Sequence, residues 1–269
     1  MKSGENELRA KIKDIQALED DRQETIDKVG VKNLKYPIVL EDRSRGVQKT
    51  VADIDFFVEL PHHYRGTHMS RFIEVLNSYH QEDLLDNLPR ILESIKEKLS
   101  ADRAYITLRF PYFIEKKAPV SGIPSLLSYD CVFIASLTDL FQLTIGVEVP
   151  VTTVCPCSRE ISSFGAHNQR SIVSVLLDYE GYIWLEEIIA YVEATASSEI
   201  YSLLKREDEK YITEKGYENP KFVEDIVRDL AITLKKDERV TAFKISSENF
   251  ESIHNHNAYA YLEWEKGDQ

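Results

Sequence analysis

The sequence predicts an α+β protein of two tandem β-β-α-α-β-β modules, in which each antiparallel sheet carries its pair of helices on one face. Runs with strand character and runs with helical spacing follow one another in the same order in both halves of the chain. Amphipathic helices bury their apolar faces against one side of such a sheet. With 269 residues, of which 43% are apolar, the chain is long enough to bury a sizeable core.

The first module is expected to span residues 29–139. The apolar residues from Leu84 to Ile95 recur every three or four positions, which is helical spacing. The expected elements are a strand, two helices and two strands, at residues 49–60, 70–80, 82–100, 103–113 and 129–137. The preceding residues 1–28 are highly charged and only loosely helix-periodic, so we expect a helical or disordered arm there.

The second module is expected to span residues 140–266, with the same order of elements and one more recognisable strand before its helices. Its elements are two strands, two helices and two strands, at residues 141–154, 170–179, 185–205, 220–236, 239–247 and 257–264. The repeat rests on element order alone, because the two halves show no visible similarity residue by residue. Small antiparallel sheets leave exposed edges that proteins cover or pair. We therefore expect a homo-oligomer in which sheets join edge to edge.

Composition and charge exclude several classes of protein. The net charge of −13 argues against a broad nucleic-acid surface, which needs clustered Lys and Arg. No apolar run is long enough to span a membrane, and the charged start lacks the apolar segment of a signal peptide. The three cysteines are too few, and odd in number, for a secreted disulfide framework. We expect a cytoplasmic protein with reduced thiols and no nucleic-acid or membrane partner.

Cys155 and Cys157 stand one residue apart behind a strand-like run, and His167 follows in the next loop. Pro156 between the cysteines is expected to bend the chain. A thiolate and an imidazole together suit Zn²⁺, Fe²⁺ or another borderline cation, with further ligands from elsewhere. The same pattern also fits two buried small residues and a hydrogen-bonded surface histidine. A redox pair is the weakest interpretation, because redox enzymes usually use the wider C-x-x-C spacing.

A second polar cluster lies near the carboxyl end of the chain. Glu248, Glu251, His254 and His256 share one short stretch, mostly between two predicted strands. Histidines in H-x-H spacing, with carboxylates upstream, bind metal or act as general acid and base near neutral pH. A solvated polar loop is the alternative, although polar loops seldom contain so many groups suited to one site.

Two further positions suit a purine or an anion. Glu224 lies in the helical pattern that begins near Pro220, and a carboxylate there accepts two parallel hydrogen bonds from an amidine-like edge such as that of guanine. A helix-surface role is the alternative. His68 and Arg71 begin the first predicted helix, with Ser70 as a candidate N-cap. Helix N-termini favour anions such as phosphate, whereas capping and ordinary surface contacts are the alternatives.

Several stretches of the chain match one known family. They are RGTHMSRF, KKAPVSG, PVTTVCPCSREIS, GAHNQRS, KREDEKYITEKGYENPKFVED and ENFESIHNHNAYAY, and they run through nearly all of the chain after about residue 29. With these motifs the sequence resembles the GTP cyclohydrolase IB family, the second folate-pathway type in many bacteria. The resemblance implies a tunnelling fold, whose modules assemble through their sheets into barrels, commonly in a homotetramer with active sites between subunits.

The implied reaction converts GTP and water to 7,8-dihydroneopterin triphosphate and formate, the entry step to tetrahydrofolate and, in some bacteria, to queuosine-type bases. The resemblance implies a divalent cation, Mn²⁺, Fe²⁺ or Zn²⁺, and its implied ligands are Cys155, His167, Glu209 and His254. The residues implied to act in catalysis close to that metal are Cys155, Glu251, His254 and His256. Cys157 is expected to support this site rather than to bind the metal.

The resemblance also implies how GTP binds. Glu224 resembles the glutamate that anchors the purine ring in tunnelling-fold enzymes. The candidate ligands of the triphosphate are the cationic residues Arg71, His68, Lys116, Lys117, Arg170, Lys210 and Lys215. Two alternatives stand beside this function: an archaeal-type variant that forms a cyclic phosphate of dihydroneopterin, and a non-catalytic purine or pterin binder with the same fold.

Overall fold

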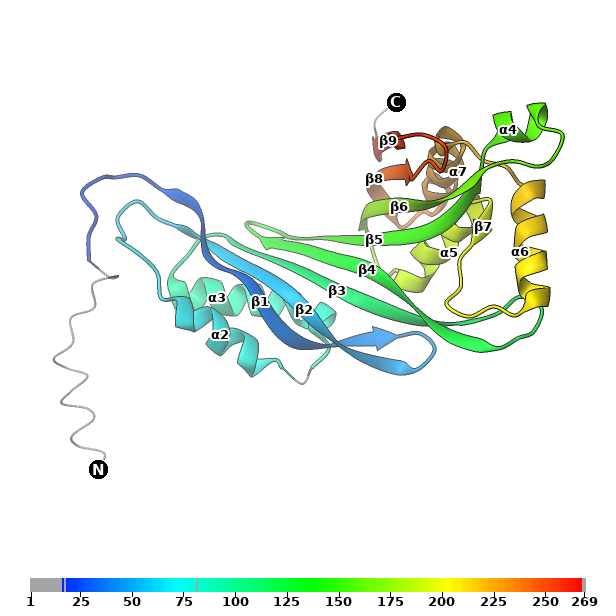
Figure 1. Ribbon diagram of the computed structural model, residues 1–269. Helices are drawn as coiled ribbons and strands as arrows, with labels where there is room; N and C mark the ends of the chain where they lie inside the picture. Colours follow the sequence, from blue (N-terminus) through cyan, green and yellow to red (C-terminus); the bar gives the residue numbers. More distant parts are fainter. Residues whose placement is uncertain (1–15, 17, 81, 268–269) are drawn as a thin grey trace. The chain divides into compact units, whose positions relative to one another are not determined.

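The computed structural model describes residue 16, residues 18–80 and residues 82–267 (Figure 1). Most of the predicted N-terminal arm lies outside these described residues. The chain forms two compact units. The first contains the described residues up to Asp42 with Val47–Leu108 and Ile134–Gln142, and the second contains Arg43–Gly46, Arg109–Phe133 and the described residues from Leu143 onward. None of the described helices is long and apolar enough to cross a membrane.

The first unit is a sheet with two helices on one face. Its elements are β1 (Ile26–Asp42), β2 (Gly46–Leu60), α2 (Met69–Ser78) and α3 (Leu84–Leu99), with parts of β3 (Ala104–Lys117) and β4 (Pro124–Leu137). Hydrogen-bonded neighbours follow the order β1-β2-β3-β4. Helices α2 and α3 lie side by side and contact β1 (Figure 1). The predicted helices in this part of the chain are therefore confirmed.

The helices of the first unit are held by apolar residues at helical spacing. The buried face of α2 contains Phe72, whose ring meets that of Phe56 on β2 edge to face, with centroids 5.1 Å apart. On α3, Leu88 and Ile91 are completely buried. Burying each such side chain stabilises the fold by about 1.5–3 kcal/mol. Asp83 is the N-cap of this helix, and its carboxylate accepts a hydrogen bond from the backbone nitrogen of Asp86 at 3.0 Å.

Strand β1 has no counterpart among the predicted elements. Its burial pattern explains this, because only its last part alternates clearly, with Ile38 and Leu40 buried. The earlier part is mostly exposed or half-buried and contains several lysines. Asn33 also interrupts the strand with a left-handed φ of 55°. A strand that exposes so much of its length lacks the apolar alternation from which strands are predicted.

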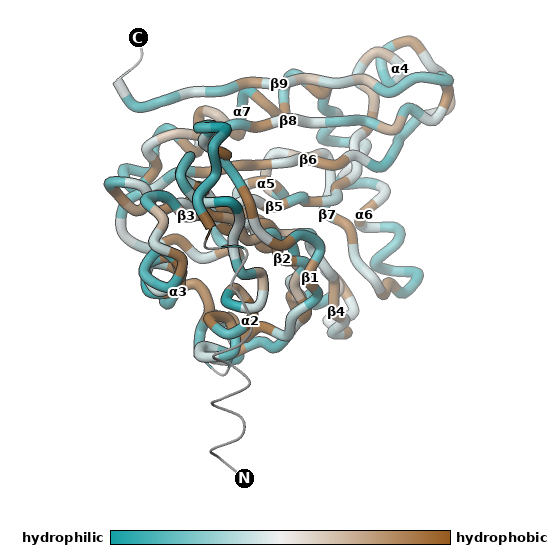
Figure 2. Tube along the Cα trace, turned by 90° about the vertical axis from the view of Figure 1, so that its left-hand side faces the viewer, coloured by the Kyte–Doolittle hydropathy of each residue, from teal (hydrophilic) through white to brown (hydrophobic). Residues whose placement is uncertain are grey.

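The second unit is an antiparallel sheet with helices and a short additional strand. Its elements are β5 (Phe141–Val154), α4 (Pro156–Ile161), β6 (Asn168–Tyr179), α5 (Leu185–Thr195), β7 (Ser198–Glu199), α6 (Arg206–Glu218), α7 (Val223–Lys236), β8 (Val240–Asn249) and β9 (Ala258–Glu265). The strand order is β4-β5-β6-β8-β9, and β7 pairs with β5. Hydrophobic and hydrophilic residues alternate along the strands (Figure 2), as expected of half-buried sheets.

The core of the second unit lies between the sheet and helices α5 and α7. Inward residues of neighbouring strands, such as Val149, Val173 and Ile245, are completely buried. Helix α7 contacts β8 and β9, and α5 contacts α7 and β7. Val192 on α5 and Leu230 on α7 are completely buried. This arrangement confirms the predicted α+β class, with an antiparallel sheet and amphipathic helices.

Helix α5 is shorter than the helix predicted over residues 185–205. It ends at Thr195, and the chain then forms β7 beside β5. The hydroxyl of Ser197 accepts a hydrogen bond from the backbone nitrogen of Val154 at 3.1 Å. This tertiary hydrogen bond and the pairing of β7 with β5 hold the chain in an extended conformation after Thr195, so the helix ends there.

Helix α6 was not predicted as a separate helix, because its charged sequence has little apolar periodicity. Asp208 in its first turn is completely buried. Its carboxylate accepts hydrogen bonds from the backbone nitrogens of Val120 and Ser121, both at 2.8 Å, and from the Ser121 hydroxyl at 2.7 Å. The backbone nitrogen of Lys205 donates a further bond at 2.9 Å. Burial raises the pKa of Asp208, but these hydrogen bonds outweigh it and hold the pKa well below its ordinary value.

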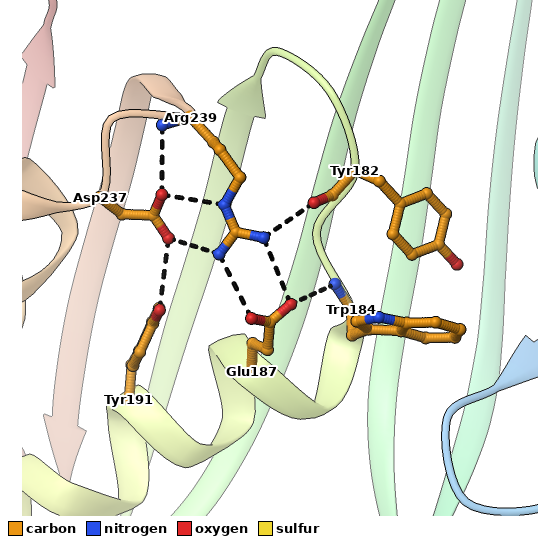
Figure 3. Close-up of polar contacts among 6 residues, drawn as sticks. All are labelled: Tyr182, Trp184, Glu187, Tyr191, Asp237 and Arg239. Atoms are coloured by element: carbon orange, nitrogen blue, oxygen red, sulfur yellow. Dashed lines mark hydrogen bonds and ion pairs between the residues drawn. The ribbon is translucent and has the colours of Figure 1, made fainter.

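Arg239, directly before β8, ties the start of α5 to the turn after α7 (Figure 3). Its guanidinium donates to both carboxylate oxygens of Asp237, at 2.9 and 2.7 Å, and to the backbone oxygen of Tyr182 at 2.8 Å. It also contacts Glu187 at 3.3 Å. Hydrogen bonds from Arg239 lower the pKa of Asp237. The guanidinium thus fixes the spacing of two helices that cover the sheet.

Candidate active site

The ends of β5 and β6 bring Cys155 and His167 together. The backbone nitrogen of Cys155 donates to the backbone oxygen of His167 at 3.1 Å, which closes the loop that contains α4. Pro156 occupies the first position of α4, so the chain bends there as predicted. The Ser158 hydroxyl donates to the oxygen of Cys155 at 3.1 Å and accepts from the nitrogen of His167 at 3.2 Å. These bonds fix the backbone on both sides of the pair.

The two thiols of this loop have different surroundings. Cys155 is half-buried, and its sulfur accepts a hydrogen bond from the backbone nitrogen of Ser158 at 3.5 Å. Cys157 is exposed on α4. Both are free thiols, as is the buried Cys131, whose pKa is raised because burial disfavours its charged form. Of the two, Cys155 is the one whose backbone bonds directly to that of His167.

The imidazole of His167 points toward two acceptors. Its Nδ1 lies 3.0 Å from Oε1 of Gln169 and 3.9 Å from a carboxylate oxygen of Glu251. The side chains of His167 and Glu251 are only 14% and 12% exposed. Glu251 follows β8, and its backbone nitrogen donates to the oxygen of Asn249 at 3.0 Å. A thiol, an imidazole and a carboxylate predicted to act together thus lie at the ends of three neighbouring strands.

A row of buried polar residues lies behind His167. It consists of Gln169, Thr153, Ser171 and Asn249, which are linked by hydrogen bonds across β5, β6 and β8. None of these four residues was predicted as part of the site. A signal existed, because each occupies an inward position that continues the apolar row of its strand. Polar residues at such positions need a partner, and here the partners are one another.

The two histidines of the H-x-H stretch are exposed in the loop between β8 and β9. The rings of His254 and His256 stack with centroids 5.1 Å apart. The side chain of Asn257 donates to Glu248 at 2.7 Å, which links the two ends of this loop. Within the described part of the chain, no group of three or more His, Cys, Asp or Glu side chains is arranged to hold a metal. One chain therefore brings Cys155 and His167 together but does not assemble the whole predicted ligand set.

Two predicted glutamates occupy exposed positions at helix starts. Glu209 lies in the first turn of α6, next to the buried Asp208. Glu224 lies in the first turn of α7. Glu209 is thus placed on a segment that Asp208 holds rigidly to residues 120 and 121, while its own carboxylate faces outward.

The predicted cations differ in their partners. Three lysines have carboxylate partners: Lys116 lies 2.7 Å from Glu193, Lys210 2.6 Å from Glu214, and Lys215 2.6 Å from Glu199. Lys117 and Arg170 are exposed. Arg71 donates to the backbone oxygen of Lys98 at 2.6 Å and lines a cavity of about 180 Å³ together with Thr67 and His68.

A larger cavity of about 300 Å³ lies next to the Cys155–His167 loop. It is lined by Val154, Gly165, Ala166, Asn168, Thr213, Glu214, Tyr217 and Glu218. Tyr217 also stacks under the guanidinium of Arg159, 5.0 Å from its ring centroid. The volume of this cavity is at the lower end of the range for small-molecule sites, which occupy about 300–1,000 Å³. Val154 and Ala166, which directly precede Cys155 and His167 in sequence, contribute to the lining, so the cavity borders the loop that contains these two residues.

Solved structures similar to this chain define its fold. Uricase from Arthrobacter globiformis aligns with 90% of this chain and 95% of its own length, with a TM-score of 0.53 at 9% identity. Urate oxidase from Bacillus subtilis 168 aligns with 90% of this chain and 100% of its own length, with a TM-score of 0.53 at 11% identity. These are tunnelling-fold proteins, so the predicted tunnelling fold is confirmed. At such identities the likeness extends to the fold alone.

Sequence comparison defines the family. A family model described as type I GTP cyclohydrolase folE2 matches residues 12–260. The GTP cyclohydrolase FolE2 of Geotalea uraniireducens is 54% identical over 258 residues, 96% of this chain and 95% of that protein. Those of Syntrophus aciditrophicus and Geobacter sulfurreducens are 55% and 52% identical, each over 94% of this chain and over 99% and 98% of their own lengths. The chain belongs to the type I GTP cyclohydrolase FolE2 family. This confirms the predicted resemblance and the predicted enzyme class, a GTP cyclohydrolase of folate biosynthesis.

Proposed function

We propose that this chain uses one divalent metal ion per site to convert GTP and water to 7,8-dihydroneopterin triphosphate and formate. This is the first step toward tetrahydrofolate and, in some organisms, toward queuosine-type bases. The observation that carries the proposal is the backbone bond that joins Cys155 to His167 at the ends of β5 and β6, with a carboxylate oxygen of Glu251 3.9 Å from the His167 ring, in a GTP cyclohydrolase family member. The reaction needs a site of this kind, since it combines hydrolysis with proton transfers.

We assign the metal to Cys155, His167, Glu209 and His254. The donors fit such an ion, because a thiolate, imidazoles and a carboxylate suit Zn²⁺, Fe²⁺ or Mn²⁺. The hydrogen bond from the Ser158 nitrogen holds the Cys155 sulfur in place at the start of α4. A bound divalent cation supplies Lewis acidity, which activates water for addition at C8 of the purine.

Opening of the imidazole ring needs an acid that gives a proton to the departing nitrogen and a base that removes a proton from the hydrated C8 group. We assign these proton transfers to His254 and His256 with Glu251. The histidines are exposed and stacked, so their rings are accessible to a substrate. The carboxylate of Glu251 is mostly buried beside His167, which suits a base that holds one orientation. Cys157 supports the loop of Cys155 and stays outside the metal shell.

We assign recognition of the guanine ring to Glu224, whose two carboxylate oxygens match the ring N–H and the exocyclic amine. Its exposure on α7 fits a pocket completed by a second subunit. We assign the triphosphate to the cations Arg71, His68, Lys117, Arg170, Lys116, Lys210 and Lys215. The last three hold a carboxylate within the chain and must exchange this partner for a phosphate. The cavity around Arg71 and His68 supports their role, because the buried Thr67 hydroxyl beside them has no hydrogen-bond partner among the described residues.

We propose a homotetramer in which sheets join edge to edge into barrels and complete the active sites. The modules would be residues 29–139 and 140–266, after an arm of residues 1–28. Strand β9 ends the strand order of the described chain, with β8 as its neighbour, and exposes Tyr259 and Tyr261. An edge of this kind is normally paired or covered. We place the protein in the cytoplasm, where GTP is available and where free thiols stay reduced.

The decisive experiment is GTP turnover by the metal-stripped, anaerobic protein reconstituted with Mn²⁺, Fe²⁺ or Zn²⁺ in turn. We expect formate and the fluorescent pterin in equal amounts with at least one cation. The Cys155→Ala variant should fold but release no formate, whereas the Cys157→Ala control should retain most activity. Release of pyrophosphate with a cyclic product, seen by mass spectrometry, would instead favour the cyclic-phosphate variant. Tight GTP binding without product under every cation would favour a non-catalytic purine binder.

A further inference from the structure

We propose that a one-directional chain of hydrogen bonds through Gln169, Thr153, Ser171 and Asn249 holds His167 in the tautomer with its proton on Nδ1. This leaves the lone pair of Nε2 available for a ligand. The four residues are positioning residues, because they act through His167 and do not contact substrate. The use of the lone pair for a metal rests on the proposed function, but the tautomer itself does not.

The chain of hydrogen bonds is continuous and buried. Nδ1 of His167 lies 3.0 Å from Oε1 of Gln169, and Nε2 of Gln169 donates to the Thr153 hydroxyl at 2.9 Å. The hydroxyls of Thr153 and Ser171 lie 2.9 Å apart, and Ser171 donates to Oδ1 of Asn249 at 2.7 Å. Thr153 and Ser171 are 0% exposed, Gln169 is 6% and Asn249 is 3% exposed. At such burial a hydrogen bond left unmade is costly, so each group keeps its partner.

The direction of donation along this chain of hydrogen bonds follows from the number of protons that each group has. A hydroxyl has one proton, and that of Ser171 is used toward Asn249. The Ser171 oxygen therefore accepts from Thr153. The Thr153 hydroxyl, having donated its proton, accepts from the amide nitrogen of Gln169. This fixes the amide so that its carbonyl oxygen faces His167, and a carbonyl oxygen can only accept. The proton of the neutral imidazole must therefore be on Nδ1.

The strand register makes this arrangement rigid. Thr153 pairs with Gln169 across β5 and β6, and Ser171 pairs with Asn249 across β6 and β8. The backbone of Asn249 also accepts from the nitrogen of Glu251, and a carboxylate oxygen of Glu251 lies 3.9 Å from the same Nδ1. Both groups beside Nδ1 are therefore acceptors, and both favour a proton there.

The tautomer has a chemical consequence. A neutral histidine binds a metal through the ring nitrogen that carries no proton, and the partner of the other nitrogen sets which one this is. A chain that holds the proton on Nδ1 therefore prepares Nε2 before any ligand arrives. Loss of such supporting partners typically lowers metal affinity by about 10- to 100-fold.

The test measures the tautomer directly in the full-length, metal-free protein. ¹⁵N chemical shifts of the histidine rings are recorded at about pH 8.5, where a histidine of ordinary pKa is neutral. A His167→Gln variant identifies the His167 signals by their loss. We expect the wild type to show a protonated Nδ1 and an unprotonated Nε2. A wild-type His167 with its proton on Nε2 would overturn the proposal.

Thr153→Val is the informative variant, because valine has nearly the same shape and lacks the hydroxyl. The Gln169 amide then loses its acceptor and can turn, so we expect the fraction of the Nε2–H tautomer to rise several-fold. Zn²⁺ affinity, measured by competition with a chelating dye, should fall by about 10-fold. Thr153→Ser should restore both values. Ser171→Ala is a second variant with the same expected direction, should the first fail to fold.

Ser247→Ala is the matched control. Ser247 is also completely buried at an inward position of β8, but its hydroxyl has no hydrogen-bond partner among the described residues. It should leave the tautomer unchanged. An unchanged tautomer in Thr153→Val would overturn the proposal, and a shift of equal size in Ser247→Ala would do the same. Absence of GTP turnover with the expected tautomer intact would refute the proposed function alone.

Discussion

The two units of the chain contain similar elements but bury different residues. Among the described residues, the first unit buries four polar or charged ones: Asp42, Asp55, Thr67 and Asn87. The second buries nine: Thr153, Gln169, Ser171, Thr195, Ser197, Ser198, Asp208, Ser247 and Asn249. Five of those nine lie on the inward rows of β5, β6 and β8. Cys155 directly follows β5, and His167 directly precedes β6. Both units are held together by buried apolar residues. The second, which contains the candidate site, also has buried polar residues on the inward rows of its strands β5, β6 and β8.

The second unit also contains segments that the first lacks. Helix α4, strand β7 and helix α6 interrupt the simple order of strands and helices. Each is held by polar contacts more than by an apolar face, as Ser197 and Asp208 show. Segments of this kind place side chains accurately at the rim of a sheet without enlarging its core. The comparison therefore predicts that core substitutions lower the stability of both units alike. Substitutions of buried polar residues should affect the second unit more than the first.

Core substitutions should have the largest effect on stability. Leu88→Ala on α3 and Leu230→Ala on α7 each empty a completely buried position of a corresponding helix. Each should lower the free energy of unfolding by about 2–5 kcal/mol, through lost burial and the cavity left behind. Urea unfolding at fixed protein concentration measures this. Ile232→Ala, at an exposed position of α7, is the control and should change it by less than about 0.5 kcal/mol. A negligible effect in only one unit would break the comparison.

Asp208→Asn should have the next largest effect. Asparagine keeps the shape, but its amide NH₂ group would face N–H and O–H donors that now point at a carboxylate oxygen. We expect the Tm to fall by roughly 5 °C at pH 7. The exposed neighbour serves as a control, since Glu209→Gln should leave the Tm nearly unchanged.

The same variant predicts a dependence on pH. Because the folded pKa of Asp208 lies below the unfolded value of about 3.9, the charged form stabilises the fold at higher pH. This contribution is complete above the unfolded pKa and disappears as the pH falls through the folded one. The difference in Tm between wild type and Asp208→Asn should therefore shrink below about pH 4. A constant difference would contradict the role of the charge.

The sequence predicted what depends on apolar spacing and missed what depends on polar contacts. Leu84 to Ile95 predicted α3 within two residues at each end, because its buried face recurs at helical period. Helix α6 escaped prediction because its stability depends on Asp208 and a distant loop. Cys155 and His167 were considered together from residue type and spacing, and the structure joins them by a backbone hydrogen bond. Asn249 was not predicted, since strand register places it opposite Ser171 and so links it to His167 only through other residues. Gln169 was also missed, although it lies two residues after His167 at an inward position of β6.

Arg239→Lys should have a smaller effect than either change above. Lysine keeps the charge but loses the planar fork that contacts Asp237, Glu187 and the Tyr182 oxygen (Figure 3). Because the side chain is about one third exposed, with 35% of its surface accessible, we expect a loss of about 1 kcal/mol in the free energy of unfolding. Arg228→Lys, at an exposed position of α7, should change nothing measurable. GTP turnover per folded molecule should stay at the wild-type value in both.

His254→Ala and His256→Ala should have the smallest effect on stability and a large one on the reaction. Both rings are exposed and stack mainly on each other, so each change should alter the free energy of unfolding by less than about 0.5 kcal/mol. If they transfer protons in the reaction, GTP turnover should fall by about 10²- to 10⁴-fold. Asn255→Ala, between them in the same exposed loop, should retain most activity. Full turnover in both histidine variants would remove this loop from the mechanism and leave the buried row behind His167 as the part of the second unit most closely tied to function.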